Sequence, residues 1–342
     1  MTDVLRNNWF VVLIAVIIIG FIGYFIYDTN KDNVSAKSSN NEQVVASINK
    51  DDITAKDLYD ESAPYDGSTI YNMYKNAVVD QSIKTTKDLK KQANTLEANI
   101  KSNASKQSDD YESTLTSELA KYGYSSFDDL NDYCLTSVKE KEMNKRYITK
   151  HFKDLKTAWE TKSPRTVSII KMDVSDADNL TETETKKKSN IETALTKESF
   201  ADVAKAFSED SNTANKKGFA GYIDTDSTTS TSSSSSSTVP AAVATAAISL
   251  QKGDTSDWIT VTTSSGTSLY KVYVKETDSS KIFNAKNDAV ANQALYAVLN
   301  SDSSLSYKIL KSYAKKLDIK FNDKSTKKKF DSYVETTYGG DQ

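Results

Sequence analysis

The feature that most constrains this chain lies near its N-terminus, where the run from Trp9 to Tyr27 contains no charged side chain. A helix needs about 20 apolar residues to cross the ~30 Å hydrocarbon core of a bilayer, so the run predicts a transmembrane anchor. Arg6 precedes the run, and the segment that begins at Asp28 carries no net positive charge. The positive-inside bias therefore predicts a cytoplasmic N-terminus, a single crossing, and an extracytoplasmic location for the remaining chain.

A cleaved signal peptide is the alternative interpretation of this run. The apolar core of a signal peptide spans about 7–15 residues, which is shorter than the run seen here. The tripeptide Val34-Ser35-Ala36 resembles a cleavage site, but it lies well beyond the apolar residues. Cys134 lies far downstream, so it cannot serve as an N-terminal lipid attachment site. We therefore predict an uncleaved anchor, and a cleaved signal peptide stays open as the alternative.

The composition narrows the class of the remaining chain. Glycine and proline are scarce, at 10 and 3 residues, which favours long helices over an all-β fold. The formal net charge of -3 gives no reason to expect a nucleic-acid partner. A single cysteine excludes an internal disulfide, and a single histidine, His151, excludes zinc sites that need two or more His or Cys ligands. We expect neither a metal nor a cofactor.

Periodicity divides the chain into segments of different character. A short strand at Val44–Ile48 leads to Thr54, which can cap a helix, and the pattern from Thr69 to Trp159 is helical. From Ser163 to Thr277 strands alternate with helices, and from Ile282 the pattern is helical again. We therefore predict an α+β chain in which two helical segments form one domain and an α+β domain is inserted between them.

The predicted boundaries follow from these changes of pattern. They are a cytoplasmic tail at 1–8, the anchor at 9–27, a linker at 28–43, the first part of the helical domain at 44–162, the α+β domain at 163–277 with a Ser/Thr-rich loop at 224–238, and the second part of the helical domain at 278–342. The Ser/Thr-rich loop is of low complexity and offers no apolar side chains for packing. Strands follow it, so we interpret it as a loop insertion.

Several stretches resemble one known family. "VVASINKDDITAKDLYDE" is similar to the opening of the SurA-like chaperone domain, while "FADVAKAFSEDSNTANKKGFAGYI" and "VPAAVATAAISLQKGDTSDWI" are similar to consecutive parts of a parvulin domain. The order of parts resembles the PrsA-like, membrane-anchored parvulin-type foldases of Gram-positive bacteria. The resemblance implies a peptidyl-prolyl cis/trans isomerase fold with a SurA-like chaperone domain, no cofactor, and folding secreted polypeptides as partners. A homodimer is a further expectation by analogy.

The resemblance also implies site residues, and two of them depart from the family. Ile169 and Tyr270 stand where the family has histidines, so the first cannot form a side-chain hydrogen bond, whereas Asp210 in "SEDS" matches the family's acid. Val243 matches the pocket aromatic with an offset of one residue. Phe207 and Tyr222 are further candidates for substrate binding. The isomerisation barrier of ~18–20 kcal/mol comes from amide resonance, and a pocket without histidines is expected to lower it weakly or not at all.

Three functions remain open on the sequence. The leading hypothesis is an extracytoplasmic, membrane-tethered foldase or chaperone whose parvulin domain is weak or inactive. The second is an active isomerase that uses Asp210 with Tyr270 and main-chain groups. The third is a cell-envelope scaffold that contacts wall polymers through its lysine-rich C-terminal face and the Ser/Thr-rich loop, although charge runs are usually solvated faces.

Overall fold

The computed structural model describes residues 38–39, 42–48, 51–54, 66–229, 239–317 and 319–339. They divide into two compact units, Met1–Asp66 and Gly67–Gln342. In the first unit, β1 (Ser38–Ser39), β2 (Glu42–Ile48) and β3 (Asp51–Thr54) form an antiparallel sheet in that order. The strand predicted at Val44–Ile48 is confirmed and begins two residues earlier, inside the predicted linker.

The predicted anchor at Trp9–Tyr27 and the predicted helix after Thr54 lie outside the described residues. Within the part of the chain that the structure describes, none of the helices combines the length and the apolar character needed to cross a membrane.

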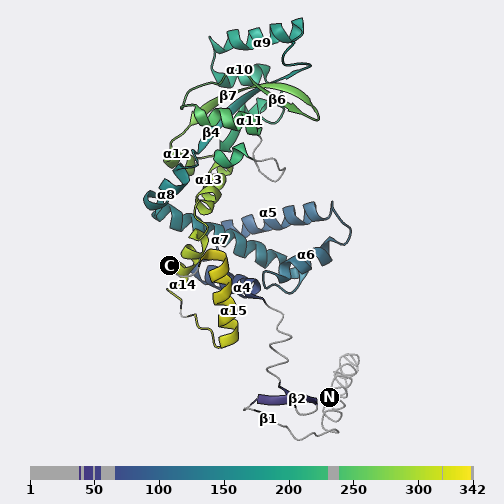
Figure 1. Cartoon of the computed structure of the whole chain (residues 1–342), viewed down its shortest axis with the longest axis vertical. Helices are drawn as coiled ribbons and strands as arrows, with labels where there is room; N and C mark the ends of the chain where they lie inside the picture. The colour runs from purple at the N-terminus through teal and green to yellow at the C-terminus, as the bar shows by residue number, and fades with distance from the viewer. Residues whose placement is uncertain are drawn as a thin grey trace, which may run out of the picture. The chain divides into compact units, whose positions relative to one another are not determined.

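Most of the second unit is helical (Figure 1). One set of helices precedes a β-sheet in the sequence, and a second set follows it. Before the sheet come α4 (Gly67–Ser82), α5 (Lys87–Ala104), α6 (Tyr111–Ala120), α7 (Leu130–Lys150) and α8 (Phe152–Glu160). After it come α12 (Ser279–Phe283), α13 (Asp288–Asn300), α14 (Leu305–Ala314) and α15 (Lys324–Tyr338). The helical pattern predicted from Thr69 to Trp159 is therefore confirmed.

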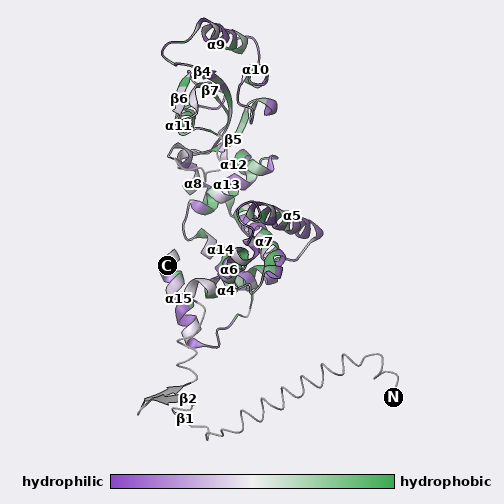
Figure 2. Cartoon of the chain, turned by 90° about the vertical axis from the view of Figure 1, so that its right-hand side faces the viewer, coloured by the Kyte–Doolittle hydropathy of each residue, from purple (hydrophilic) through white to green (hydrophobic). Residues whose placement is uncertain are grey.

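Local sequence signals determine where these helices begin. The Thr86 hydroxyl accepts a hydrogen bond from the Leu89 N–H at 3.2 Å and caps α5. Ser126 and Asp129 form a capping box on a short 3-10 turn, Phe127–Asp129, that leads into α7. The backbone N–H groups of Ser126 and Ser125 stabilise the Asp129 carboxylate and lower its pKa. In Figure 2, α5 and α9 (Glu182–Leu195) alternate between hydrophilic and hydrophobic colours, as amphipathic helices do.

The two helical segments share one hydrophobic core. Its buried residues come from all five helices before the sheet, α4 to α8, and from all four after it, α12 to α15. Tyr71 of α4, for example, stacks on Phe330 of α15 with ring centroids 6.1 Å apart. The two segments complete this core together, because α14 and α15 pack on α4 and α13 packs on α8.

A four-stranded antiparallel sheet lies between these helical segments in sequence. Its strands are β4 (Arg165–Val174), β5 (Phe219–Ile223), β6 (Ile259–Thr263) and β7 (Gly266–Glu276), in the order β5-β4-β7-β6. Three further helices accompany it, namely α9, α10 (Phe200–Phe207) and α11 (Ala241–Ser249). The alternation of strands and helices predicted from Ser163 to Thr277 is confirmed.

Each face of the sheet packs on different helices. Ile169 of β4 belongs to the core that α11 covers, whereas its neighbour Ile170 belongs to the core that α9 and α10 cover. This split follows from the period of two along a strand, which turns successive side chains to opposite faces. Helices therefore cover both faces of the sheet, and Figure 1 shows α9 and α10 above it.

Candidate functional site

Three successive cross-strand pairs of β4 and β7 turn their side chains to the α11 side of the sheet. These pairs, from the centre of the strands outwards, are Ile169–Val272, Lys171–Tyr270 and Asp173–Ser268. We call them the apolar row, the Lys–Tyr row and the Asp–Ser row. Side chains directly opposite each other on antiparallel strands lie ~4.5–5.5 Å apart at Cβ, so each row forms one local environment.

The apolar row is closed to solvent. Ile169, Val272 and Val243 of α11 have no exposed surface, and all three belong to the same core. The Ile169 N–H donates to the Gly218 carbonyl at 2.8 Å, which holds the strand position. A side chain buried in this way contributes packing, and it offers neither a donor nor an acceptor to a bound peptide.

The Lys–Tyr row carries a positive charge, that of the Lys171 ammonium. The Lys171 Nζ lies 2.8 Å from the Asp173 Oδ1, and the Ser268 hydroxyl donates to the same oxygen at 2.7 Å. The hydrogen bond from Lys171 to Asp173 raises the pKa of the Lys171 ammonium, and the nearby Tyr270 and Asp210 raise this pKa further. The ammonium is thus firmly protonated at neutral pH and is held by a partner two residues along its own strand.

A loop after α10 brings Asp210 to this face. The Glu209 N–H donates to the Lys171 carbonyl at 2.9 Å, and the Lys171 N–H donates to the Ser208 hydroxyl at 3.1 Å, so the loop runs beside β4 beyond the end of β5. The Asp210 carboxylate accepts from the Thr213 hydroxyl at 2.7 Å. Burial raises the pKa of Tyr270, Lys171 opposes this effect, and the charge of Asp210 adds to it.

Ile169, Tyr270, Val243 and Asp210 therefore gather on one side of the sheet, as the resemblance implies. Phe207 does not join them, because it packs against the core on the opposite face. Tyr222 lies elsewhere as well, in the core of the helical segments.

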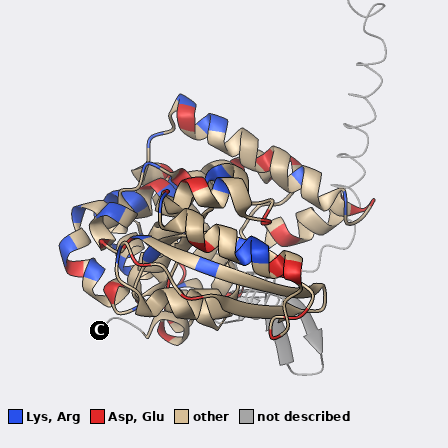
Figure 3. Cartoon of the chain, turned by 90° about the horizontal axis from the view of Figure 1, so that it is seen from above, with Lys and Arg blue, Asp and Glu red and all other residues tan. Residues whose placement is uncertain are grey.

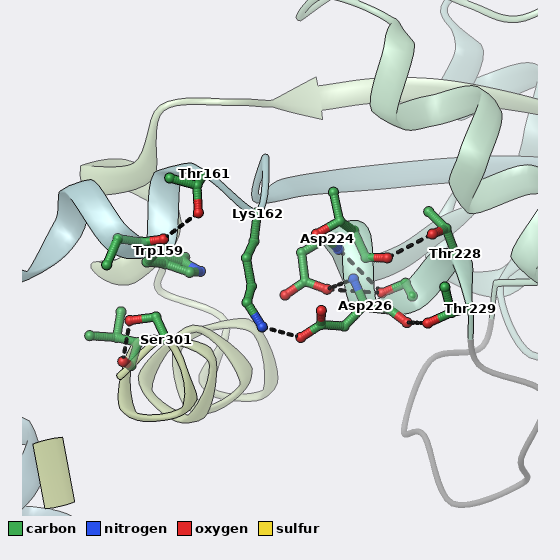
Figure 4. Close-up of polar contacts among 12 residues, drawn as sticks. Trp159, Thr161, Lys162, Asp224, Asp226, Thr228, Thr229 and Ser301 are labelled. Atoms are coloured by element: carbon green, nitrogen blue, oxygen red, sulfur yellow. Dashed lines mark hydrogen bonds and ion pairs between the residues drawn. The ribbon is translucent and has the colours of Figure 1, made fainter. Parts of the chain in front are cut away.

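Tyr222 connects the helical part to the sheet. Its hydroxyl accepts from the Trp159 Nε1 at 2.9 Å and donates to the Asp224 Oδ2 at 2.7 Å. Close by, the Lys162 Nζ reaches the Asp226 Oδ2 at 2.5 Å, as Figure 4 shows. The Tyr222 hydroxyl uses both hydrogen bonds within the protein, so it forms a buried bridge between Trp159 of α8 and Asp224, which follows β5.

Residues 169–273 match the model of the rotamase family, the PPIC-type PPIase domain. The chain carries a PPIC-type parvulin domain. The match begins at the first of the two residues at family histidine positions and ends just after the second, so it spans all three rows.

Relatives of known name agree with the predicted resemblance. Over 211 residues the chain is 28% identical to "Foldase protein PrsA" of Streptococcus sanguinis (strain SK36), a match that covers 61% of this chain and 55% of that protein. The chain thus matches about half the length of that relative. The predicted resemblance to PrsA-like parvulin foldases is confirmed.

Solved structures of similar proteins include foldases and chaperones. PrsA from Bacillus subtilis matches with 22% identity and a TM-score of 0.41 over 84% of this chain and 97% of that chain. Foldase protein PrsA from Streptococcus pneumoniae str. Canada MDR_19A matches with 20% identity and a TM-score of 0.38 over 86% and 99%. A SurA-like chaperone of Campylobacter jejuni matches with 15% identity and a TM-score of 0.23 over 82% and 100%.

Sequence reasoning missed two residues of this parvulin face, Lys171 and Asp173. A usable signal was present, because every second residue from Ile169 shares its face of the strand. Together the rows offer a buried apolar floor, a half-buried phenol ring, an ammonium group and the Asp173 carboxylate, and the loop after α10 adds the carboxylate of Asp210. These groups can pack against a ring and donate a hydrogen bond to a carbonyl oxygen.

Proposed function

We propose that this protein is an extracytoplasmic, membrane-tethered foldase that holds secreted polypeptides while they fold, with a parvulin domain that isomerises prolines weakly or not at all. The observation that carries the proposal is the complete burial of Ile169 at the position of a family histidine. A residue without exposed surface cannot touch a substrate, and its hydrocarbon side chain cannot orient Asp210 through a hydrogen bond. The PrsA-like relatives, which are named foldases, support the general function.

The holding function belongs to the helical domain in this proposal. We assign residues 44–162 and 278–342 to a SurA-like chaperone domain and 163–277 to the inserted parvulin domain. The shared core of the two helical segments supports this division. Basic and acidic residues are interspersed along the helices (Figure 3), so the helical domain has mixed charge and would contact clients through local patches.

A groove between α7, α13 and α14 is the proposed contact for clients. It has a volume of about 520 Å³, and its walls include the apolar side chains Leu295, Tyr296 and Leu299 beside the polar Ser137 and Asn144. Tyr296 is 55% exposed, although large apolar side chains are usually covered. An exposed aromatic ring beside serine and asparagine groups can pack on an apolar client residue while the polar groups bind its backbone.

Suppression of aggregation tests this function. The chain at equimolar dose should slow the light-scattering increase of a reduced or heat-denatured secreted protein, without ATP. Tyr296→Ser should weaken the effect, whereas Met73→Ser should leave it unchanged, because Met73 is also exposed but does not line the groove. Equal suppression by both variants would refute the groove, and no suppression by the wild type would refute the holding function.

The second candidate is an active isomerase that uses Asp210. The observation in its favour is that Asp210 lies close enough to Tyr270 and Lys171 for its charge to raise the pKa of both side chains. It requires that Asp210→Ala abolishes a measurable acceleration of cis/trans exchange, which the first proposal does not expect.

The membrane anchor at 9–27 and a homodimer complete the proposal. The anchor predicts that the chain stays with the membrane fraction after alkaline carbonate washing, and that it is released when the run is replaced by a polar sequence. Sedimentation equilibrium of the chain in detergent would report the homodimer.

A further inference from the structure

The stretch 315–330, which joins α14 to α15 and begins α15, concentrates positive charge. It contains seven lysines and two aspartates, a local charge of +5, in a chain whose formal net charge is -3. None of these lysines lines the groove proposed for clients. We call them the basic surface: Lys315, Lys316, Lys320, Lys324, Lys327, Lys328 and Lys329.

The basic surface faces solvent and has few acidic partners. All of its lysines except Lys329 are exposed. Lys327 pairs with Asp331 one turn further along α15, whereas Lys324 and Lys328 form no ion pair with any residue that the structure describes. Their ammonium groups are therefore hydrated and available to an anionic ligand.

The lysines of α15 lie where a helix disfavours them. The N-terminal end of a helix carries partial positive charge, which favours acids and disfavours cations. Asp323 caps α15, but the first turn contains Lys324 and no acidic residue. Lys324 and Lys328 are one turn apart, and like charges at that spacing destabilise a helix, whereas Lys101 of α5 pairs with Glu97 at the same spacing. A cluster that opposes the stability of its own helix indicates a binding role.

The connection between α14 and α15 is fixed to the helical domain. The Phe321 ring centroid lies 5.1 Å from that of Phe330 in α15 and 6.0 Å from that of Tyr74 in α4. Leu317 and Ile319 also pack against the core and stay partly exposed. Apolar residues thus lie among the lysines, a composition typical of surfaces that lie against a membrane interface.

We infer that the basic surface binds the anionic phospholipid headgroups of the membrane to which the chain is anchored, and so holds the helical domain against the bilayer. The inference rests on the proposed anchor at 9–27. Residues 28–66, which follow the anchor, can extend to at most about 140 Å, so the bilayer stays within reach of the surface. Clusters of about four to eight basic residues near a membrane are typical of binding to anionic lipids.

A soluble polyanion, such as a wall polymer, is the alternative ligand. The bilayer is favoured because partly exposed apolar residues lie among the lysines and because the anchor keeps a bilayer close to them. The two ligands are separated below by vesicles of different charge and by inorganic polyphosphate.

The test uses the full chain reconstituted into vesicles of phosphatidylcholine alone or of phosphatidylcholine and phosphatidylglycerol in equal parts. A trace of an amine-reactive acylating reagent is added outside, and the acylation rate of each lysine is measured by mass spectrometry. The double variant Lys324→Gln, Lys328→Gln removes two cations from the surface. The matched control is Lys90→Gln, Lys91→Gln, which removes two exposed cations from α5 instead.

We expect Lys315, Lys316 and Lys327 to react at least about threefold more slowly on the anionic vesicles, because each lysine near an anionic surface strengthens binding about fivefold. At ~1 M salt, where the Debye length is about 3 Å, the rates should return to those on neutral vesicles. The double variant of α15 should weaken docking about 25-fold and lose the protection, whereas the α5 control should keep it. Both should suppress aggregation as the wild type does, because neither changes the client groove.

Equal rates on the two kinds of vesicle would overturn the inference, and so would protection that persists in the α15 variant. Equal protection by inorganic polyphosphate on neutral vesicles would also overturn it, since the ligand would then be a soluble polymer. Release of the chain by alkaline carbonate would refute the anchor alone, because the basic surface should still bind anionic vesicles at low salt. A chain that is released by carbonate and also fails to bind anionic vesicles refutes both.

Discussion

Replacing Tyr222 by phenylalanine should destabilise the protein far more than the loss of a single oxygen atom would at the surface. Tyr222 is 7% exposed, and its hydroxyl bridges the Trp159 Nε1 and the Asp224 Oδ2. Phenylalanine keeps the ring and removes both hydrogen bonds. Burial raises the pKa of Tyr222, so the hydroxyl stays protonated and able to donate throughout the usual pH range.

The magnitude follows from the partners left behind. A net hydrogen bond contributes about 0.5–1.5 kcal/mol between neutral groups and about 1.5–3 kcal/mol to a charged group. Trp159 is completely buried and Asp224 is 5% exposed, so neither regains full hydration. Asp224 keeps its Oδ1 bond from the Asp226 N–H at 3.0 Å, which limits the loss. We expect a loss of about 2–4 kcal/mol in unfolding free energy.

Urea unfolding followed by tryptophan fluorescence is the assay. With m-values of about 1–3 kcal/mol/M or more, the midpoint should fall by about 1 M. Tyr296→Phe is the matched control, because the Tyr296 side chain is largely exposed and its hydroxyl should matter by less than ~0.5 kcal/mol. If both variants unfold at the same midpoint, the buried bridge does not stabilise the contact between the helical part and the sheet.

Three further predictions concern single positions. Gly218 has φ of 76°, and a Cβ there would lie 2.6 Å from both the Ala204 Cβ and the Ile169 carbonyl oxygen, so Gly218→Ala should cost about 2 kcal/mol or more in a urea titration. Burial raises the pKa of Cys134 to about 11, so its thiol should resist a thiol reagent at pH 8 in the native state and react fully in urea; rapid native labelling would contradict its burial. Backbone N–H groups of Thr181 and Ser175 lower the pKa of Glu184 to about 2, from 4.5. Its carboxylate therefore contributes stability above pH 4.5 that is lost as the pH falls towards 2. Glu184→Gln should be less stable than wild type at pH 7 and equally stable near pH 2, and a gap independent of pH would contradict this.

The elements of the parvulin domain could be predicted because their signals are local. Helix α10, Phe200–Phe207, has its apolar residues at helical spacing, and the Ser199 side chain caps its first turn. In strand β4, Arg165–Val174, every residue except Arg165, Lys171 and Asp173 is buried. Secondary-structure propensity, hydrophobic periodicity and helix capping each depend on residues that are close together in the chain, so they can be recognised in a single sequence.

Contacts between distant residues could not be predicted in the same way. Tyr222 has the aromatic character expected of a binding surface, but its partner Trp159 lies 63 residues away and determines its role. In the sequence Lys171 is an ordinary charged residue, and only the register of β4 against β7 places it opposite Tyr270. The side of the sheet on which Phe207 packs depends likewise on how α10 crosses the strands, which no local pattern specifies.

The measurement that tests the central claim most directly is NMR exchange spectroscopy on an Xaa-Pro peptide with the chain and with its Asp210→Ala variant. A protein that holds its clients without isomerising their prolines should leave the cis/trans exchange rate at its uncatalysed value, with or without Asp210. Acceleration by the wild type that disappears in Asp210→Ala would contradict the account, because it would show that a parvulin face without histidines still catalyses isomerisation.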